Sequence, residues 1–211
     1  WQVIAEPMRL QHVTPKRGSY RAEAEFQMHY VGLDPLYLDK YPPELSGGQR
    51  QRLAIARALT MEPELLVADE PIAALDVSIQ AQIVNLFRHL QQEHGFTFLF
   101  IAHDLSMVEF LCDRVGVLYH GRLVELATAK ELYANPLHPY TQALFQAMPD
   151  PTRLHEMAVP LAGEIPSPLA PPQGCYFHPR CPRAQKVCSL EKPCWHVVGP
   201  GHRVKCHLAD Q

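Results

Sequence analysis

Apolar residues follow two different spacings in the middle of the chain. Two short runs, ELLVADE (64–70) and FTFLFIAH (96–103), are continuously apolar and end in polar residues, which is typical of buried strands of a parallel sheet. Between them four apolar residues recur at helical spacing: Ile79, Ile83, Phe87 and Leu90. Gly95 stands where a C-terminal helix cap belongs. Strand, helix and strand in this order predict a βαβ unit and an α/β fold.

The segments around this unit have patterns of their own. Residues 1–60 indicate helices joined by turns, and VGVLYHGRLVE (115–125) has two β-rich halves around His120–Gly121, which predicts a hairpin. After a predicted helix over 138–148, the chain becomes rich in proline and then in cysteine. We therefore expect four parts: a helical part (1–60), part of an α/β core (61–127), a helix with a proline-rich linker (128–172) and a cysteine-rich module (173–211).

Composition narrows the class of protein. The 211 residues are 47% hydrophobic and 19% charged, which is enough apolar material for a real core. The formal net charge is −3 and the lysines and arginines are dispersed, so we expect no nucleic-acid partner. The longest strongly apolar runs are far shorter than the roughly 20 residues of a membrane-spanning helix. The sequence predicts a globular protein that does not cross a bilayer by itself.

Candidate chemistry stands at the ends of the two predicted strands. Asp69 and Glu70 follow the first strand, where an aspartate can hold Mg²⁺ and a glutamate can polarise an attacking water. His103 ends the second strand and can hydrogen-bond a phosphate, while Asp104 is suited to cap the next helix. Each group also has a structural interpretation: Asp69 as a turn cap, Glu70 as a solvated side chain and His103 as a satisfied histidine. A glycine turn before a helix, a strand that ends in Asp-Glu and a strand that ends in His, in this order, indicate a functional site more strongly than any one of them alone.

A third element is LSGGQRQRLAIARAL (45–59), in which two glycines open a helix. Glycines allow a close backbone approach, a serine hydroxyl can donate, and a helix N-terminus favours an anion. The turn and the first helical residues are Ser46, Gly47, Gly48 and Gln49.

Together these segments resemble the ATPase subunits of ABC transporters. LSGGQRQRLAIARAL resembles the signature motif, ELLVADEP the Walker B strand, AALD (73–76) the D-loop and IAHD the switch-histidine region. The resemblance implies a P-loop NTPase core in which Mg²⁺ and ATP lie between two subunits, with the signature turn of one subunit against the γ-phosphate held by the other. It implies these roles: Mg²⁺-linked acid for Asp69, catalytic base for Glu70, γ-phosphate switch for His103, and communication across the nucleotide-bound dimer for Asp76.

The sequence also departs from this family pattern. No GxxxxGK(S/T) motif occurs, so the Walker A loop that wraps the phosphates is not in the sequence. WQVIAEPMRL (1–10) resembles the segment just after the glutamine loop of the family. We therefore expect a partial ATPase core that lacks the N-terminal part with Walker A and the glutamine loop, and that does not bind ATP alone.

The C-terminal part narrows the resemblance. NPLHPYTQAL (135–144) and the cysteine-rich tail resemble the extension of oligopeptide and dipeptide importer ATPases, a branch that includes nickel importers. The resemblance implies a peripheral protein on the cytoplasmic face of the bacterial inner membrane. Its implied partners are a second ATPase subunit, two transmembrane permease subunits and, indirectly, an extracytoplasmic peptide-binding protein. Two alternatives stay open: a non-transport ABC ATPase, and a polypeptide whose working part is the tail alone.

Five of the six cysteines lie in the last 37 residues, whereas Cys112 fits a small buried hydrophobe. In a reducing compartment this density favours metal binding over disulfides, and the spacing is not that of a usual zinc site. The resemblance implies a four-iron, four-sulfur (4Fe–4S) cluster with Cys194 as an extra cysteine. Its ligands would be Cys175, Cys181, Cys188 and Cys206. Zinc with mixed ligands from His178, His202 and His207, or no metal, remain alternatives.

Overall fold

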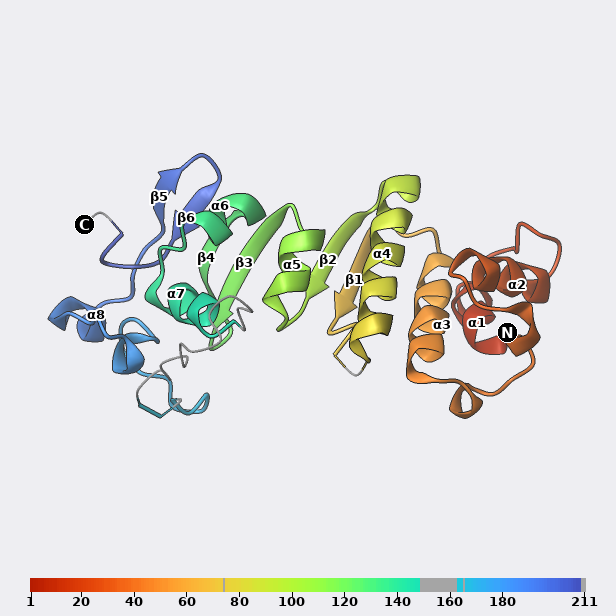
Figure 1. The fold of residues 1–211 in the computed structure, drawn as a ribbon, viewed down its shortest axis with the longest axis horizontal. Helices are drawn as coiled ribbons and strands as arrows, with labels where there is room; N and C mark the ends of the chain where they lie inside the picture. Colours follow the sequence, from red (N-terminus) through yellow and green to blue (C-terminus); the bar gives the residue numbers. More distant parts are fainter. Residues whose placement is uncertain (74, 149–162, 165, 210–211) are drawn as a thin grey trace. The chain divides into compact units, whose positions relative to one another are not determined.

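The computed structural model describes residues 1–73, 75–148, 163–164 and 166–209, and Figure 1 shows its ribbon. The chain forms two compact units, Trp1–His103 and Asp104–Gln211, and the residues of each unit pack mainly against one another. Ala74 of the AALD segment and part of the proline-rich linker lie outside the described residues. The expected part boundaries at 60, 127 and 172 stay predictions.

The first half of unit 1 is helical, as the sequence pattern predicts. Helices α1 (Gln2–Leu10), α2 (Tyr20–Tyr30) and α3 (Gly47–Leu59) pack against one another, with 3-10 turns at Pro35–Tyr37 and Pro42–Glu44. Their shared core contains fully or almost fully buried apolar side chains: Ile4, Met8, Met28 and Ile55. This packing fixes the position of α3, whose first two residues are Gly47 and Gly48.

The predicted βαβ unit is confirmed in the second half of unit 1. Strand β1 (Leu65–Asp69) pairs in parallel with β2 (Thr97–Ile101), and α4 (Val77–His94) connects them. Helix α4 ends at Gly95, whose φ of +66° is the left-handed conformation that glycine adopts without strain. Phe87 of α4 contacts Phe98 of β2 with ring centroids 4.8 Å apart, so the helix covers one face of the strand pair.

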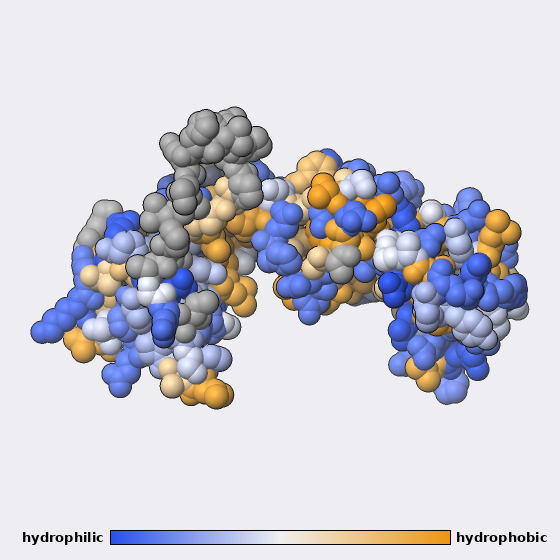
Figure 2. All heavy atoms as spheres, turned by 60° about the horizontal axis from the view of Figure 1, so that its bottom comes forward, coloured by the Kyte–Doolittle hydropathy of each residue, from blue (hydrophilic) through white to orange (hydrophobic). Residues whose placement is uncertain are grey.

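The other face of this strand pair is more open than the apolar runs predicted. Val67 is 54% exposed and Leu99 is 50% exposed, and they alternate with the side chains that face α4. In the described part of the chain β1 and β2 pair with each other alone and receive one helix layer. The expectation of fully buried strands was therefore wrong for this structure. On the view in Figure 2, hydrophobic residues form scattered patches between hydrophilic ones.

Unit 2 is built on a four-stranded antiparallel sheet. Its strands lie in the order β3 (Arg114–Tyr119), β4 (Arg122–Thr128), β6 (His202–Val204) and β5 (His196–Gly199). The predicted hairpin is confirmed, and both turn residues, His120 and Gly121, have positive φ. Because β4 pairs with β6, the C-terminal tail adds two strands to a hairpin far away in the sequence.

Five short helical elements lie in the described part of unit 2. They are α5 (Leu105–Leu111), α6 (Ala129–Ala134), α7 (Pro139–Gln146), a 3-10 turn (His178–Arg180) and α8 (Lys186–Leu190). Asp104 caps α5 as predicted, because its carboxylate accepts hydrogen bonds from the backbone N–H groups of Ser106 and Met107. Helix α7 confirms the helix expected over 138–148. Across the described residues, none of the helices has the length and apolar character needed to span a bilayer.

Candidate functional site: the end of the parallel strands

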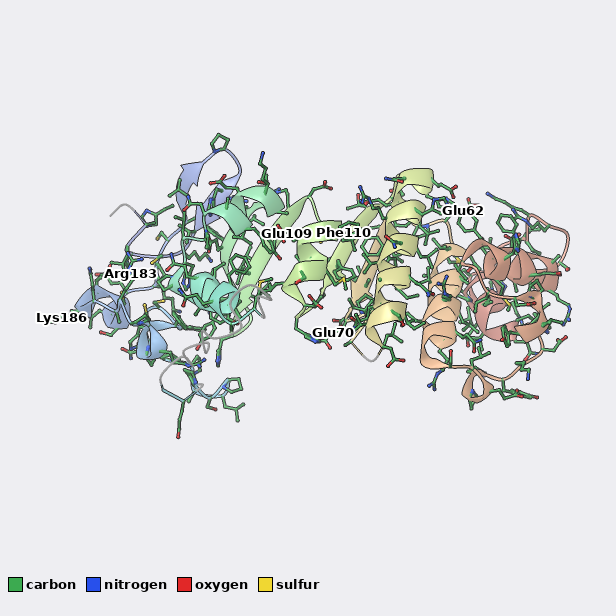
Figure 3. The ribbon with its side chains drawn as sticks, in the orientation of Figure 1. Glu62, Glu70, Glu109, Phe110, Arg183 and Lys186 are labelled. Atoms are coloured by element: carbon green, nitrogen blue, oxygen red, sulfur yellow. The ribbon has the colours of Figure 1, made fainter. Side chains whose placement is uncertain are left out.

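The structure brings Glu70 and His103 together at the carboxyl end of the parallel strand pair. Asp69 pairs with Ile101 in the ladder, and the Glu70 N–H donates to the Ile101 carbonyl at 2.8 Å, so the pairing continues one residue past β1. This register places Glu70 Oε1 3.6 Å from His103 Nδ1. Figure 3 shows Glu70 at this end of β1. A carboxylate and an imidazole from two different strands thus share one small region.

Both side chains of this pair are open to solvent. The exposed fraction is 56% for Glu70 and 70% for His103, and Asp69 is exposed beside them. Glu70 has a φ of +44°, a conformation that costs a non-glycine residue free energy and is concentrated at functional sites. An exposed ion pair contributes about 0–1 kcal/mol to stability, so the arrangement is poorly explained as a structural clamp. It leaves both groups accessible to a water or a phosphate.

A short loop leads from Glu70 to Asp76. Two backbone hydrogen bonds shape it: the Ala73 N–H donates to the Glu70 carbonyl at 3.3 Å, and the Leu75 N–H donates to the Ile72 carbonyl at 3.2 Å. Asp76 is the N-terminal residue before α4, and its exposed carboxylate makes no capping hydrogen bond. The side chain of Asp76 is therefore not used to start its own helix, and its predicted role across a dimer stays a prediction.

The glycine turn before α3 is a capping box. The Ser46 hydroxyl accepts a hydrogen bond from the Gln49 N–H at 3.3 Å, and the Ser46 N–H donates to Gln49 Oε1 at 2.8 Å. The S-x-x-Q spacing predicts this motif, a signal that our sequence analysis did not use. The Ser46 hydroxyl keeps its own proton for donation to a ligand, whereas the Gln49 side chain already holds the helix start.

Gly48 is also required by packing inside unit 1. A Cβ atom at Gly48 would lie 2.6 Å from Cγ2 of Ile79 on α4, closer than real Cβ contacts come. One turn later Arg52 donates to the Val31 carbonyl at 2.6 Å and to Gln82 Oε1 of α4 at 3.1 Å. The glycine turn is thus attached to the helix that follows the Glu70 loop, a contact that the sequence did not indicate.

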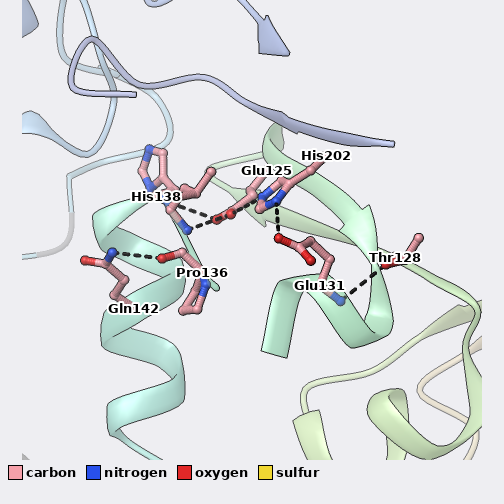
Figure 4. A network of polar contacts seen from close by, with 8 residues as sticks. Glu125, Thr128, Glu131, Pro136, His138, Gln142 and His202 are labelled. Carbon is pink, nitrogen blue, oxygen red and sulfur yellow. Dashed lines mark hydrogen bonds and ion pairs between the residues drawn. The ribbon is translucent and has the colours of Figure 1, made fainter. Parts of the chain in front are cut away.

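A buried polar network in unit 2 was also not predicted from the sequence (Figure 4). Glu125 on β4 is fully buried and accepts hydrogen bonds from the backbone N–H groups of Leu137 at 2.8 Å and His138 at 3.0 Å. It also pairs with His202 Nε2 on β6 at 2.8 Å, while His202 Nδ1 lies 3.7 Å from a carboxylate oxygen of Glu131. One carboxylate therefore joins the NPLHPY segment to the cysteine-rich tail.

The histidines named as alternative zinc ligands have other partners in this structure. His202 lies between two carboxylates, His178 Nδ1 contacts the Cys175 carbonyl at 2.9 Å, and His207 Nε2 contacts the Glu191 carbonyl at 3.0 Å. His138, beside Glu125, is held neutral because burial lowers its pKa to about 4, with the carboxylate opposing this effect. The observed side-chain arrangement does not favour mixed histidine and cysteine ligation.

The four cysteines named as cluster ligands influence one another electrostatically. Burial raises the pKa of Cys175, Cys181 and Cys206, and in each case neighbouring thiols of the set raise it further. Cys188 and Cys206 are buried, Cys175 and Cys181 are partly buried, and Cys194 is exposed. Within the described residues, however, no three His, Cys, Asp or Glu side chains converge in an arrangement that could hold a metal ion.

Cys112, the cysteine outside the tail, is only partly buried, and burial raises the pKa of its thiol.

Two family models match the chain. The one described as "ABC transporter" matches residues 3–73, which include the glycine turn, Asp69 and Glu70. The chain belongs to the ABC transporter family. The second model, "Oligopeptide/dipeptide transporter, C-terminal region", matches residues 124–188, which include Glu125, α7 and the first three cysteines of the tail.

Curated members of the ABC family align with almost the whole chain. It is 49% identical to the oligopeptide transport ATP-binding protein AppF of Bacillus subtilis over 209 residues, 98% of this chain and 63% of that protein. It is 50% identical to the putative peptide import ATP-binding protein BOV_A0347 of Brucella ovis over 97% of this chain and 65% of that protein. The chain therefore spans just under two thirds of the length of these relatives.

Solved structures of ABC proteins resemble the fold. CbiO1 of Clostridium perfringens, described as part of the ABC transporter complex CbiONQ, is 29% identical, with a TM-score of 0.55 over 72% of this chain and 56% of that chain. An inward-facing putative metal-chelate type ABC transporter is 24% identical, with a TM-score of 0.58 over 70% of this chain and 57% of that chain. The second similarity concerns the fold alone.

Proposed function

We propose that the protein carrying this chain hydrolyses ATP to energise the import of oligopeptides or dipeptides. The observation that carries the hydrolytic part is the Glu70–His103 pair, 3.6 Å apart at the carboxyl end of a parallel strand pair. In parallel α/β sheets this end is where ligands bind and react. The relatives named for peptide transport support the substrate class.

In this mechanism Glu70 accepts a proton from, and orients, the water that attacks the γ-phosphate. His103 lies beside Glu70 and donates a hydrogen bond to a γ-phosphate oxygen. Asp69 would hold Mg²⁺, which would supply neutralisation of phosphate charge. The turn at Ser46, Gly47 and Gly48 binds the γ-phosphate of a nucleotide held by the second subunit. The Ser46 hydroxyl proton and the positive end of the α3 dipole suit that anion.

The chain would supply one part of a larger assembly. We infer a partial P-loop NTPase core with a cysteine-rich extension, which does not hold ATP alone because its sequence contains no GxxxxGK(S/T) motif. The inferred partners are a second ATPase subunit, two permease subunits and, indirectly, an extracytoplasmic binding protein. The protein would act at the cytoplasmic face of the bacterial inner membrane.

Peptide uptake tests the proposed function. Cells that lack the gene should lose uptake of a labelled di- or oligopeptide, and the wild-type gene should restore it. Unchanged peptide uptake in the deletion strain would contradict peptide import. A loss of nickel uptake with normal peptide uptake would support the transport ATPase function and show that the substrate is nickel and not a peptide.

We also propose that Cys175, Cys181, Cys188 and Cys206 hold a 4Fe–4S cluster that stabilises the tail. Two features of the structure support the donor set. Neighbouring thiols of the set raise the pKa of Cys175, Cys181 and Cys206. Backbone N–H groups also donate to sulfur, from Gln185 to Cys188 Sγ at 3.5 Å and from Leu208 to Cys206 Sγ at 3.4 Å. Such N–H contacts to sulfur are one of the ways in which proteins tune these clusters.

Metal analysis of the full-length protein, purified without oxygen, tests the cluster. We expect iron and acid-labile sulfide in equal amounts and a broad visible absorption, both lost in Cys188→Ser. Cys194→Ser is the matched control and should keep both, because Cys194 is exposed and lies outside the thiol set. Zinc without iron, no metal, or an unaffected Cys188→Ser protein would each overturn the cluster.

A further inference from the structure

Two hydrogen bonds in the loop after Glu70 share one acceptor, the Ile72 carbonyl. The Ile72 carbonyl accepts the hydrogen bond of the Leu75 N–H at 3.2 Å, and a second one from Nε2 of Gln80 at 3.1 Å. The Ile72 side chain is 3% exposed, so this point of the loop is anchored in the protein. The Ile72 carbonyl thus accepts one hydrogen bond from within the loop and one from a side chain of α4.

Helix α4, which carries Gln80, is itself fixed by packing against other elements of unit 1. The helix is 18 residues long, packs on β2 through Phe87, and is joined to α3 by the Gly48–Ile79 contact and the Arg52–Gln82 hydrogen bond. Gln80 is in the first turn of α4, between the two residues that meet α3. A change in the position of α4 is therefore transmitted to the Ile72 carbonyl through one hydrogen bond.

We infer that Gln80 is a positioning residue that sets the location of the Glu70 carboxylate through the Ile72 carbonyl. This inference rests on the proposed ATP hydrolysis and adds a residue to it. Glu70 has a strained φ of +44°, and the Ala73 N–H donates to its carbonyl at 3.3 Å. A strained residue keeps its conformation only where the surrounding structure holds it. Without the amide of Gln80, the two hydrogen bonds within the loop, from the Ala73 N–H to the Glu70 carbonyl and from the Leu75 N–H to the Ile72 carbonyl, would have to hold its described residues.

Hydrogen exchange and kinetics of Gln80→Ala in the full-length protein test this inference. We expect the amide of Leu75 to exchange about tenfold faster, and kcat for ATP hydrolysis to fall about tenfold with KM unchanged, because misplacement of about 1 Å can cost as much as a hundredfold. Gln80→Lys keeps a donor and should recover most of kcat, whereas Gln80→Glu has the same shape without the donor and should not. Gln92→Ala, an exposed glutamine of the same helix, is the control and should change neither quantity.

The two arms separate this inference from the proposed function. Faster exchange at Leu75 with an unchanged kcat would overturn the positioning role, and so would equal activity of the lysine and glutamate variants. Unchanged exchange would show that Gln80 does not hold the loop. A wild-type protein that hydrolyses no ATP with its partner subunits would overturn the proposed function, and the exchange arm would still report whether Gln80 anchors the loop.

Discussion

Replacing Glu70 with glutamine should lower the rate of ATP hydrolysis by about 10²–10⁴-fold, the usual contribution of a general base. The change is isosteric and removes the group that accepts the proton of the attacking water. It also removes the contact with His103, but both partners are more than half exposed, so we expect little loss of stability. Nucleotide affinity should persist, because Glu70 is proposed to act on the water and not on the nucleotide. The measurement is the turnover and nucleotide affinity of the full-length protein with its partner subunits.

Glu64→Gln is the matched control for this variant. Glu64 is an exposed glutamate just before β1, at the opposite end of the strand from Glu70. It has the same chemistry and a similar exposure, so a general effect of lost negative charge would appear in both variants. Rapid turnover by Glu70→Gln would disprove the assignment of the base, and an equal loss in Glu64→Gln would show that the effect is not specific to the site.

Replacing His202 with alanine should reduce the free energy of unfolding of unit 2 by about 1–3 kcal/mol. The change removes one hydrogen-bond partner of the buried Glu125 carboxylate, and leaving a buried polar group without a partner typically costs this much. Glu125 is fully buried and, among the described residues, would keep the N–H groups of Leu137 and His138 as hydrogen-bond donors. Urea unfolding followed by fluorescence measures the loss. A background in which Trp1 and any tryptophan outside these 211 residues are replaced by phenylalanine leaves Trp195, beside Arg203 and Lys205 of the tail, as the reporter for unit 2.

Two further variants test the geometry of the network. Glu125→Ala should cost more than His202→Ala, because it leaves two backbone N–H groups, one buried and one partly buried, and one buried imidazole without their acceptor. His207→Ala should cost about 1 kcal/mol or less, because its ring makes one exposed hydrogen bond to the Glu191 carbonyl. Equal small effects of all three would contradict the view that Glu125 joins the NPLHPY segment to the tail.

Local features of this chain followed from the sequence. The apolar runs and the helical spacing between them predicted β1, α4 and β2 in order. The hydrophobic period of a strand or helix can be recognised within a short stretch of sequence. Gly95, the His120–Gly121 turn and Asp104 were predicted for the same reason, since caps and turns depend on a few adjacent residues. The glycine turn, Asp69, Glu70 and His103 could be named as candidates from their positions at element ends.

Only the tertiary structure decided which of these groups meet. The parallel register of β1 and β2 places Glu70 beside His103, and the packing of α3 on α4 makes Gly48 necessary beside Ile79. Glu125 and His202 are 77 residues apart, and they meet because β4 pairs with β6. The spacing of the tail cysteines likewise did not show which thiols share one environment. Such contacts depend on register and on helix packing across long stretches of chain, and these are set by the global burial of apolar surface and not by adjacent residues.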